Sequence, residues 1–340
     1  EYEPEYGGQG AEHMFTVILA EEFGRCDHGA LPMALGVQVD MATPSLARFG
    51  THEQKEQYLA PAMRGEMVAS IAVSEPDHGS DVAGIRTRAV RDGDEWVING
   101  SKMWITNSVQ AVWLCLLART SDEVGYRGMS QIIVPTSAPG FSVSKKLDKL
   151  GMRASDTALL SFDDCRVPVA NTIGEIGRGF QQQMAQFVVE RMWGAYGVVG
   201  ACERAIERTA AYLRERIVFG EPLLAKQYIQ FKLAELNAEI DLLRTYNRSI
   251  AESYQRGEDT TRQATIAKLT AGRLARRVAD ECLQFHGGIG YVEETWTARF
   301  LRDNRLTSIG GGADEVMLQV LARTDGHLEH HLVGATADAG

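Results

Sequence analysis

The stretch "EWVINGSKMWITN" (95–107) decides the fold class, because it places β-prone runs on both sides of Asn99-Gly100. Val, Ile and Trp favour strands, and Asn-Gly between two such runs is the strongest short-range hairpin signal. Since too little chain remains between these and the next β-prone runs for helices, we expect an antiparallel, β-rich middle domain over residues 67–170. Gly, Pro or Asp bounds each of the four further runs: 112–119, 130–135, 141–147 and 158–168.

The segments on both sides of this domain have helical periodicity. Near the start, Phe15, Ile18, Leu19, Glu22 and Phe23 follow each other at mostly three- and four-residue steps, and Thr51 is placed to cap a later helix. In the second half, a narrow apolar seam is typical of an antiparallel bundle. The expected fold class is α+β, with a helical N-terminal domain (1–66), the β domain (67–170) and a C-terminal four-helix bundle (171–340). The seam consists of Ile229, Leu233, Leu236, Ile240 and Leu243.

Composition excludes several classes of protein. The net charge of −10 argues against nucleic acid as a partner, because phosphate binding relies on clustered Lys and Arg. No run of about 18 apolar residues occurs, so no membrane span is expected. The tail "HLEHH" (327–331) is a weak metal-binding pattern, but a solvated terminus is the simpler interpretation, and we predict no metal site.

Cysteine usage and the opening residues bear on the compartment. Five scattered cysteines without a C-x-x-C pair suit reduced thiols in a cytosol-like compartment. The opening "EYEPEYGGQG" has no charged-then-apolar leader and reads as a loop entered partway through a domain. We therefore expect a bacterial cytoplasmic protein, and a mitochondrial matrix protein stays open as the alternative.

Four motifs are ordinary when each is taken alone. "SEPDHGSDVAGIRT" (74–87) is a strand running into a turn, and "KMWITN" (102–107) is a strand with a half-buried Trp. "RIVFGEPLLAKQ" (216–227) is a helical hairpin with Pro222 at the start of its second helix. "QFHGGIG" (284–290) lacks the preceding strand that a dinucleotide-binding fingerprint requires, so it reads as a helix stop.

In combination the motifs are much more specific. S-E-P-x-x-G-S-D, W-I-T, R-x-x-F-G-x-P-L-x-x-x-Q, Q-x-x-G-G-x-G and R-D-x-R (302–305) occur in this order, and together they resemble the acyl-CoA dehydrogenase family over essentially the whole chain. The resemblance implies FAD as cofactor, an acyl-CoA as substrate and an electron-transfer flavoprotein as acceptor. It also implies α,β-dehydrogenation of the thioester as the reaction.

The resemblance carries over to individual cofactor contacts. Trp104 would lie against the isoalloxazine, two planar surfaces in contact. A first set would line the flavin: Ile71, Val73, Ser74, Gly79, Ser80, Trp104, Ile105, Thr106, Gly312, Ala313 and Glu315. A second set would contact the FAD of a neighbouring subunit, which implies a homodimer or homotetramer: Arg216, Val218, Phe219, Gln227, Gln284, Gly287 and Gly288. Val218 departs from the family, because many relatives have a hydroxyl residue there.

The catalytic base is the second departure. Removal of an α-proton from a thioester needs hydrogen-bond donors on the carbonyl and a positioned carboxylate. Most family members have this glutamate in a late I-x-E-G-T turn, which here reads Ile309-Gly310-Gly311-Gly312-Ala313. Gly311 can offer its backbone N–H to the thioester oxygen, but it cannot accept a proton.

Glu190 is the expected replacement. It is the only carboxylate between Ile176 and Cys202, and its neighbours include Phe187 and Trp193, which would raise its proton affinity. From the residues alone, a glutamate on an exposed stripe is an equally good interpretation. The isovaleryl-CoA and long-chain branches of the family place the base here, in an E-R pair. The resemblance therefore implies Glu190 as base, with Arg191 orienting the site or contacting the acyl-CoA, and Ser80 also near the substrate.

Two other functions stay open at this point. One is an oxygen-using relative, similar to acyl-CoA oxidases or nitroalkane oxidases. The other is a non-catalytic flavoprotein that kept the fold and lost its glutamate.

Overall fold

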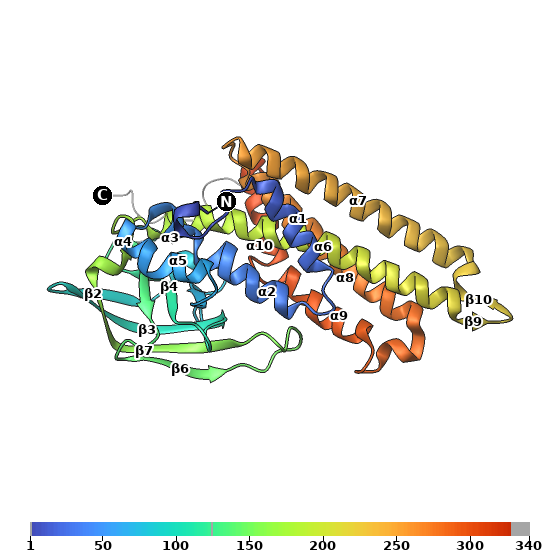
Figure 1. Ribbon diagram of the computed structural model, residues 1–340, viewed down its shortest axis with the longest axis horizontal. Helices are drawn as coiled ribbons and strands as arrows, with labels where there is room; N and C mark the ends of the chain where they lie inside the picture. The colour runs from blue at the N-terminus through green and yellow to red at the C-terminus, as the bar shows by residue number, and fades with distance from the viewer. Residues whose placement is uncertain (1, 124, 328–340) are drawn as a thin grey trace.

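The computed structural model describes residues 2–123 and 125–327 of the chain. A sheet lies at one end, short helices cover it, and long helices extend away from it (Figure 1). Residues 328–331 of the "HLEHH" tail lie outside the described residues. Within the described part of the chain, no helix is both long and apolar enough to cross a membrane.

The N-terminal part is helical, as expected. Thr51 begins α4 with a reciprocal cap: its hydroxyl accepts from Gln54 N–H, and the Gln54 side chain accepts from Thr51 N–H. The elements are η1 (Pro4–Tyr6), α1 (His13–Gly24), α2 (Ala30–Gly36), η2 (Val37–Ala42), α3 (Pro44–Phe49), α4 (His52–Gln54), η3 (Lys55–Leu59) and α5 (Ala60–Met63).

Of the apolar residues that the sequence pattern selects on α1, only Phe23 packs against the core, and it is half-buried. Phe15, Ile18 and Leu19 are exposed, whereas Val17 and Ala20 are buried. The reason is close backbone packing on α6: a Cβ on Gly200 would lie 1.9 Å from the carbonyl oxygen of Glu21. Small residues thus determine the contacting face of α1.

The middle of the chain forms an eight-stranded sheet. Its order is β6-β7-β3-β2-β4-β5-β8, and β1 pairs in parallel with β4. The longer strands are β3 (Glu95–Thr106) and β7 (Thr157–Pro168), which pair antiparallel. The others are β1 (Ala69–Ala72), β2 (Arg88–Asp92), β4 (Trp113–Arg119), β5 (Met129–Pro135), β6 (Phe141–Lys146) and β8 (Thr172–Ile173); two short helices are η4 (Val82–Gly84) and η5 (Val169–Asn171).

The hairpin expected at Asn99-Gly100 is wrong. Strand β3 runs through both residues, and the hairpin turn lies earlier, between Asp92 and Glu95. Gly100 has a φ of 143°, its register against β7 shifts, and a Cβ there would lie 2.8 Å from Cα of Thr87. Asn99-Gly100 therefore marks a β-bulge, where glycine permits a close backbone approach.

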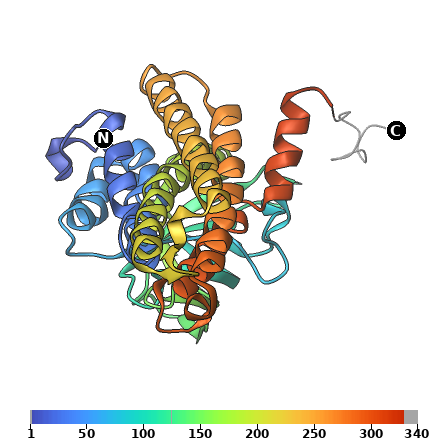
Figure 2. The ribbon, with the colours of Figure 1, turned by 90° about the vertical axis from the view of Figure 1, so that its right-hand side faces the viewer.

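Long helices form the C-terminal part. The predicted apolar seam on α7 is confirmed, because all five residues that form the seam are buried. Helix α10 packs on α8 and stands at the edge of the bundle (Figure 2). The elements are α6 (Gly179–Glu215), β9 (Ile217–Val218), β10 (Glu221–Pro222), η6 (Leu223–Ala225), α7 (Gln227–Gln255), α8 (Thr261–His286), η7 (Gly287–Tyr291), α9 (Trp296–Asn304), η8 (Arg305–Ser308) and α10 (Asp314–Thr324).

Candidate active site

Trp104 forms an exposed aromatic surface at the end of β3. Its indole is 53% exposed, and its φ of 61° is unusual for a bulky residue. A Cβ on Gly79 would lie 3.6 Å from Cζ3 of Trp104, so the glycine leaves the edge of the ring uncovered. Strained backbone that the surroundings maintain is typical of functional sites.

The two motifs around Trp104 are tied together by hydrogen bonds. Met103 N–H donates to the carbonyl of Ser74 over 2.8 Å. Behind this contact, the fully buried Lys102 donates to the Val73 carbonyl (2.7 Å) and to Glu75 (3.0 Å). The buried ion pair of Lys102 and Glu75 therefore stabilises the backbone at Val73 and Ser74, which we expect to line the flavin.

Eight residues of the first set lie at two segments of the middle domain, whereas Gly312, Ala313 and Glu315 lie in the late turn and at the start of α10. Ile71 belongs to β1, and Val73 and Ser74 continue directly from it; Gly79 and Ser80 are exposed in the following turn. Trp104, Ile105 and Thr106 end β3, and the hydroxyl of Thr106 lies 3.2 Å from that of Thr157 on β7. Helix α6 borders this region, since Phe187 packs on the apolar cluster that contains Val73.

Glu190 and Gly311 come together although they are far apart in the sequence. A Cβ on Gly311 would lie 3.9 Å from Oε1 of Glu190. Gly311 has a φ of 65°, and its exposed backbone sits in the turn between η8 and α10. A carboxylate from α6 thus reaches the place where a side chain at position 311 would begin.

The Glu190 carboxyl is poorly solvated. Its Oε2 atom is buried and accepts no hydrogen bond from any residue in 2–123 or 125–327. Burial raises its pKa to about 7, and the positive charges of Arg191 and Lys268 oppose this shift. A carboxyl group with a pKa near neutrality can accept a proton at physiological pH.

Two cations approach Glu190 from different helices. Arg191, next to it on α6, is mostly buried; burial lowers its pKa, and its Nη1 lies 3.4 Å from Thr265 Oγ1 on α8. Lys268, also on α8, donates to the carbonyl of Gly312 and is 4% exposed. The sequence reasoning missed Lys268, although a lysine on the alanine-rich face of α8 (Ala264, Ala271 and Ala275) is a usable signal.

The second set of expected cofactor residues lies at the opposite end of the molecule. The β9–β10 turn is far from the sheet (Figure 1). Tyr212 near the end of α6 stacks on His286 at the end of α8 (4.3 Å), which brings both parts of the set to this end. Its members are exposed apart from the half-buried Val218: Arg216, Phe219, Gln227, Gln284, Gly287 and Gly288.

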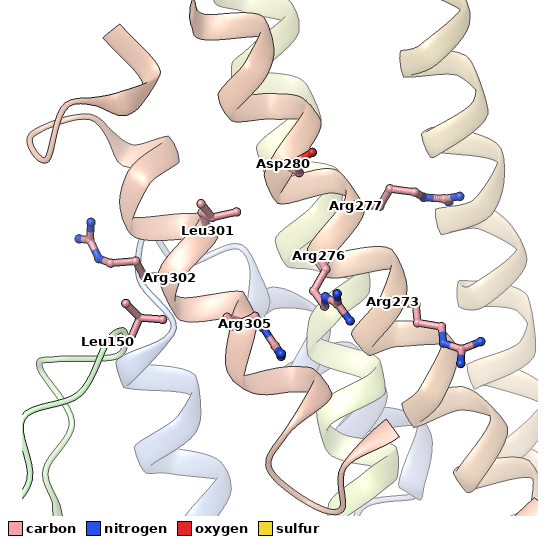
Figure 3. A pocket seen from close by; sticks show the side chains of 8 residues that line it. All are labelled: Leu150, Arg273, Arg276, Arg277, Asp280, Leu301, Arg302 and Arg305. Carbon is pink, nitrogen blue, oxygen red and sulfur yellow. The ribbon is translucent and has the colours of Figure 1, made fainter. Parts of the chain in front are cut away.

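A basic groove adjoins the late turn. Five arginines line it, from α8, α9 and η8: Arg273, Arg276, Arg277, Arg302 and Arg305 (Figure 3). In that view the Arg277 side chain points toward α7, where it pairs with Glu239; Arg302 pairs with Glu293. Arg273 and Arg276 lie 4.0 and 3.8 Å from Asp314 at the start of α10, so the groove extends to the segment that follows the late turn.

Comparisons with known proteins identify the class. The chain matches the N-terminal domain of acyl-CoA dehydrogenases over residues 1–66, the middle domain over 70–165 and the C-terminal domain over 177–324. The chain therefore belongs to the acyl-CoA dehydrogenase family. Members of this family are FAD-dependent oxidoreductases that dehydrogenate acyl-CoA.

Individual relatives agree with this assignment. Mitochondrial isovaleryl-CoA dehydrogenase of Solanum tuberosum is 37% identical over 94% of this chain and 77% of its own length. Short-chain specific acyl-CoA dehydrogenase of Rattus norvegicus is 35% identical over 95% of this chain and 78% of its own length. The structure of an acyl-CoA dehydrogenase from Geobacillus kaustophilus has a TM-score of 0.91 at 36% identity, covering 95% of this chain and 85% of that one.

The first set of residues fits a flavin. An exposed indole with a glycine at its edge offers a flat surface to a planar ring. The polar side chains and backbone of Ser74 and Thr106 lie on the same two segments of the chain, which the Met103–Ser74 hydrogen bond joins. FAD, which the family requires, is thus compatible with what these residues present.

Proposed function

We propose that Glu190 is the base that removes the α-proton of an acyl-CoA thioester. The observation that carries this proposal is the 3.9 Å between its Oε1 and the Cβ position of Gly311, combined with burial that raises its pKa to about 7. The missing glutamate of the late turn is thereby compensated by a carboxylate that reaches the same place from α6.

The surrounding residues would prepare the thioester for this step. The backbone N–H of Gly311 donates to the thioester oxygen and stabilises the negative charge that develops as the proton leaves. Trp104, Ser74 and Thr106 hold the cofactor against the substrate. Bound FAD would supply the hydride acceptor that the β-carbon of the substrate needs. Arg191, which donates to Thr265 on α8, would orient the site or contact the acyl-CoA.

Branched or longer acyl groups are the proposed substrates. Gly194 lies one helical turn after Glu190, and apart from adjoining residues and the backbone of α6 itself, a Cβ there would meet no described atom within 4 Å. Relatives of 36–37% identity include enzymes named isovaleryl-CoA dehydrogenase and 2-methylacyl-CoA dehydrogenase, which favours a branched chain.

A homodimer or homotetramer would complete the cofactor site. The second set of residues is too far from Trp104 to contact the same flavin, so it would serve the FAD of a neighbouring subunit. For the acceptor, we propose an electron-transfer flavoprotein in the bacterial cytoplasm. A solved structure 33% identical to this chain carries the description "Electron transferring flavoprotein of Acidaminococcus fermentans".

Anaerobic mixing of the holoenzyme with a panel of acyl-CoAs tests the reaction. We expect the flavin absorbance to bleach and to recover slowly in air, fastest with branched acyl groups. Rapid peroxide formation would instead indicate the oxidase-like alternative, and no bleaching with any thioester would indicate a non-catalytic protein.

Replacement of the base tests the assignment of Glu190. Glu190→Gln should keep FAD and CoA-thioester binding but lower the rate of flavin reduction about 100-fold or more. In the wild type, kcat/KM should rise with pH through about 7, because only the deprotonated Glu190 accepts a proton. Near-normal reduction by Glu190→Gln would place the base elsewhere.

A further inference from the structure

Lys268 is a buried cation between the two halves of the proposed site. It lies on α8 and is 4% exposed, among the small buried side chains of Ala264, Ala271 and Ala275. Its Nζ donates to the carbonyl of Gly312, the residue after the proposed donor Gly311. Burial lowers its pKa to about 8, with the charges of Asp314, Glu190 and Glu315 opposing the shift, so it is mainly protonated at neutral pH.

Helix α8 contacts both halves along a single face. Thr265 approaches Arg191 of α6, Lys268 binds the Gly312 carbonyl, and Gly272 packs under η8. These residues are three and four positions apart, so they lie in one row on the helix. A Cβ on Gly272 would lie 2.8 Å from Ser308 Oγ, which shows how closely α8 approaches the segment before the late turn.

We propose that Lys268 is a positioning residue, which orients the Gly311–Gly312 turn through the Gly312 carbonyl and keeps Glu190 ionised through its charge. This inference rests on the proposed role of Glu190 as base. The charged groups near Glu190 are Arg191 on α6 and Lys268 on α8; those near Lys268 are Arg191, Glu190, Asp314 and Glu315.

The two effects can be separated by substitution. Lys268→Gln keeps an N–H donor but removes the charge, Lys268→Arg keeps the charge but changes the donor geometry, and Lys268→Met removes both. Removing a positive charge near a carboxyl raises the pKa of that carboxyl. The fall of kcat/KM on the acidic side of its pH profile is called the acid limb here. Since the base acts when deprotonated, this acid limb should move to higher pH.

The pH profile of the holoenzyme tests the role of the charge. We expect Lys268→Gln and Lys268→Met to move the acid limb upward by about one pH unit, and Lys268→Arg to leave it in place. Arg262→Gln is the matched control, because it removes a positive charge from the exposed face of α8, where Arg262 pairs with Asp325. An unmoved limb in Lys268→Gln, or an equal shift in Arg262→Gln, would overturn the role of the charge.

Ligand binding without turnover tests the role of the turn. In the Glu190→Gln background, Lys268→Met should weaken binding of an acyl-CoA thioester about fivefold, through the misplaced Gly311 N–H. Binding of the thioether analogue, which has a methylene in place of the carbonyl, should not change. Equal losses for both ligands would mean a merely structural role; if Lys268→Met does not fold, Lys268→Gln and Lys268→Arg decide.

The outcomes separate this inference from the proposed function. If Glu190→Gln abolishes reduction while the Lys268 variants leave the pH limb and the thioester preference intact, only the inference about Lys268 fails. If Glu190→Gln remains active, the proposed function itself fails.

Discussion

Glycine at position 311 and glutamate at position 190 are complementary. One position has no side chain, and the other sends a carboxylate oxygen to within 3.9 Å of where that side chain would begin. Both departures from the commoner family pattern can be recognised in the sequence. Their proximity cannot, because it depends on how α6 and the late turn both pack on α8. The sequence does carry a signal for Lys268, its position among Ala264, Ala271 and Ala275, but its contact with the Gly312 carbonyl depends on the same packing.

A base transplanted to the late turn should partly replace Glu190. The double variant Glu190→Gln/Gly311→Glu should reduce its flavin at least about tenfold faster than Glu190→Gln/Gly311→Ala in stopped-flow mixing with acyl-CoA. The alanine control carries the same backbone strain, about 1–3 kcal/mol for a side chain at a positive φ, but no carboxyl. Equal rates in the two double variants would show that position 311 does not face the substrate α-carbon.

At the level of elements, the positions of the strands can be predicted from the sequence, but the pairing between strands cannot. β-Prone runs and turn residues identify β4 to β7, because alternation and turn chemistry are local properties. The Asn99-Gly100 bulge resembles a hairpin turn, since both need a conformation that glycine adopts easily. Only the partners of β3, namely β2 and β7, distinguish the two.

The ion pair of Glu75 and Lys102 should stabilise the flavin-facing segments of the sheet. Burial raises the pKa of Glu75, but Lys102 and hydrogen bonds from Thr87 and Arg86 more than offset this and hold that pKa below its ordinary value. Lys102→Met leaves the carboxylate buried without its cation and should lower the free energy of unfolding by about 3–5 kcal/mol at neutral pH. Thermal unfolding, together with the amount of bound FAD, measures the effect.

The pH dependence and a second variant check this explanation. A depressed pKa in the folded state stabilises the protein above the ordinary carboxyl pKa, and this contribution is lost as pH falls. The difference between wild type and Lys102→Met should therefore shrink in acid. Glu75→Gln/Lys102→Met should recover much of the loss; a double variant as unstable as Lys102→Met would mean that the cation acts through packing alone.

At the scale of the whole molecule, the expected cofactor residues divide between two distant ends. Trp104 is at the sheet, and Phe219 is in the β9–β10 turn at the far end of the bundle. Both are exposed aromatics with positive φ, and Phe219 is 93% exposed. Other exposed apolar side chains belong to elements at this end of the bundle: Ile217, Tyr228, Ile289 and Tyr291. A surface of this kind agrees with the proposed contact between subunits.

Coexpression of two defective chains tests whether one cofactor site is built from two subunits. Phe219→Asp and Trp104→Ala should each retain much less FAD than wild type, because each removes an aromatic contact from every site. In a mixed dimer, one site would combine an intact Trp104 from one chain with an intact Phe219 from the other, so the flavin absorbance per protein should recover. Val90→Asp is the control for Phe219→Asp, since Val90 is also an exposed apolar residue but lies on β2. If the mixture retains no more FAD than the separate variants, both residues act within the same chain and the proposed assembly is wrong.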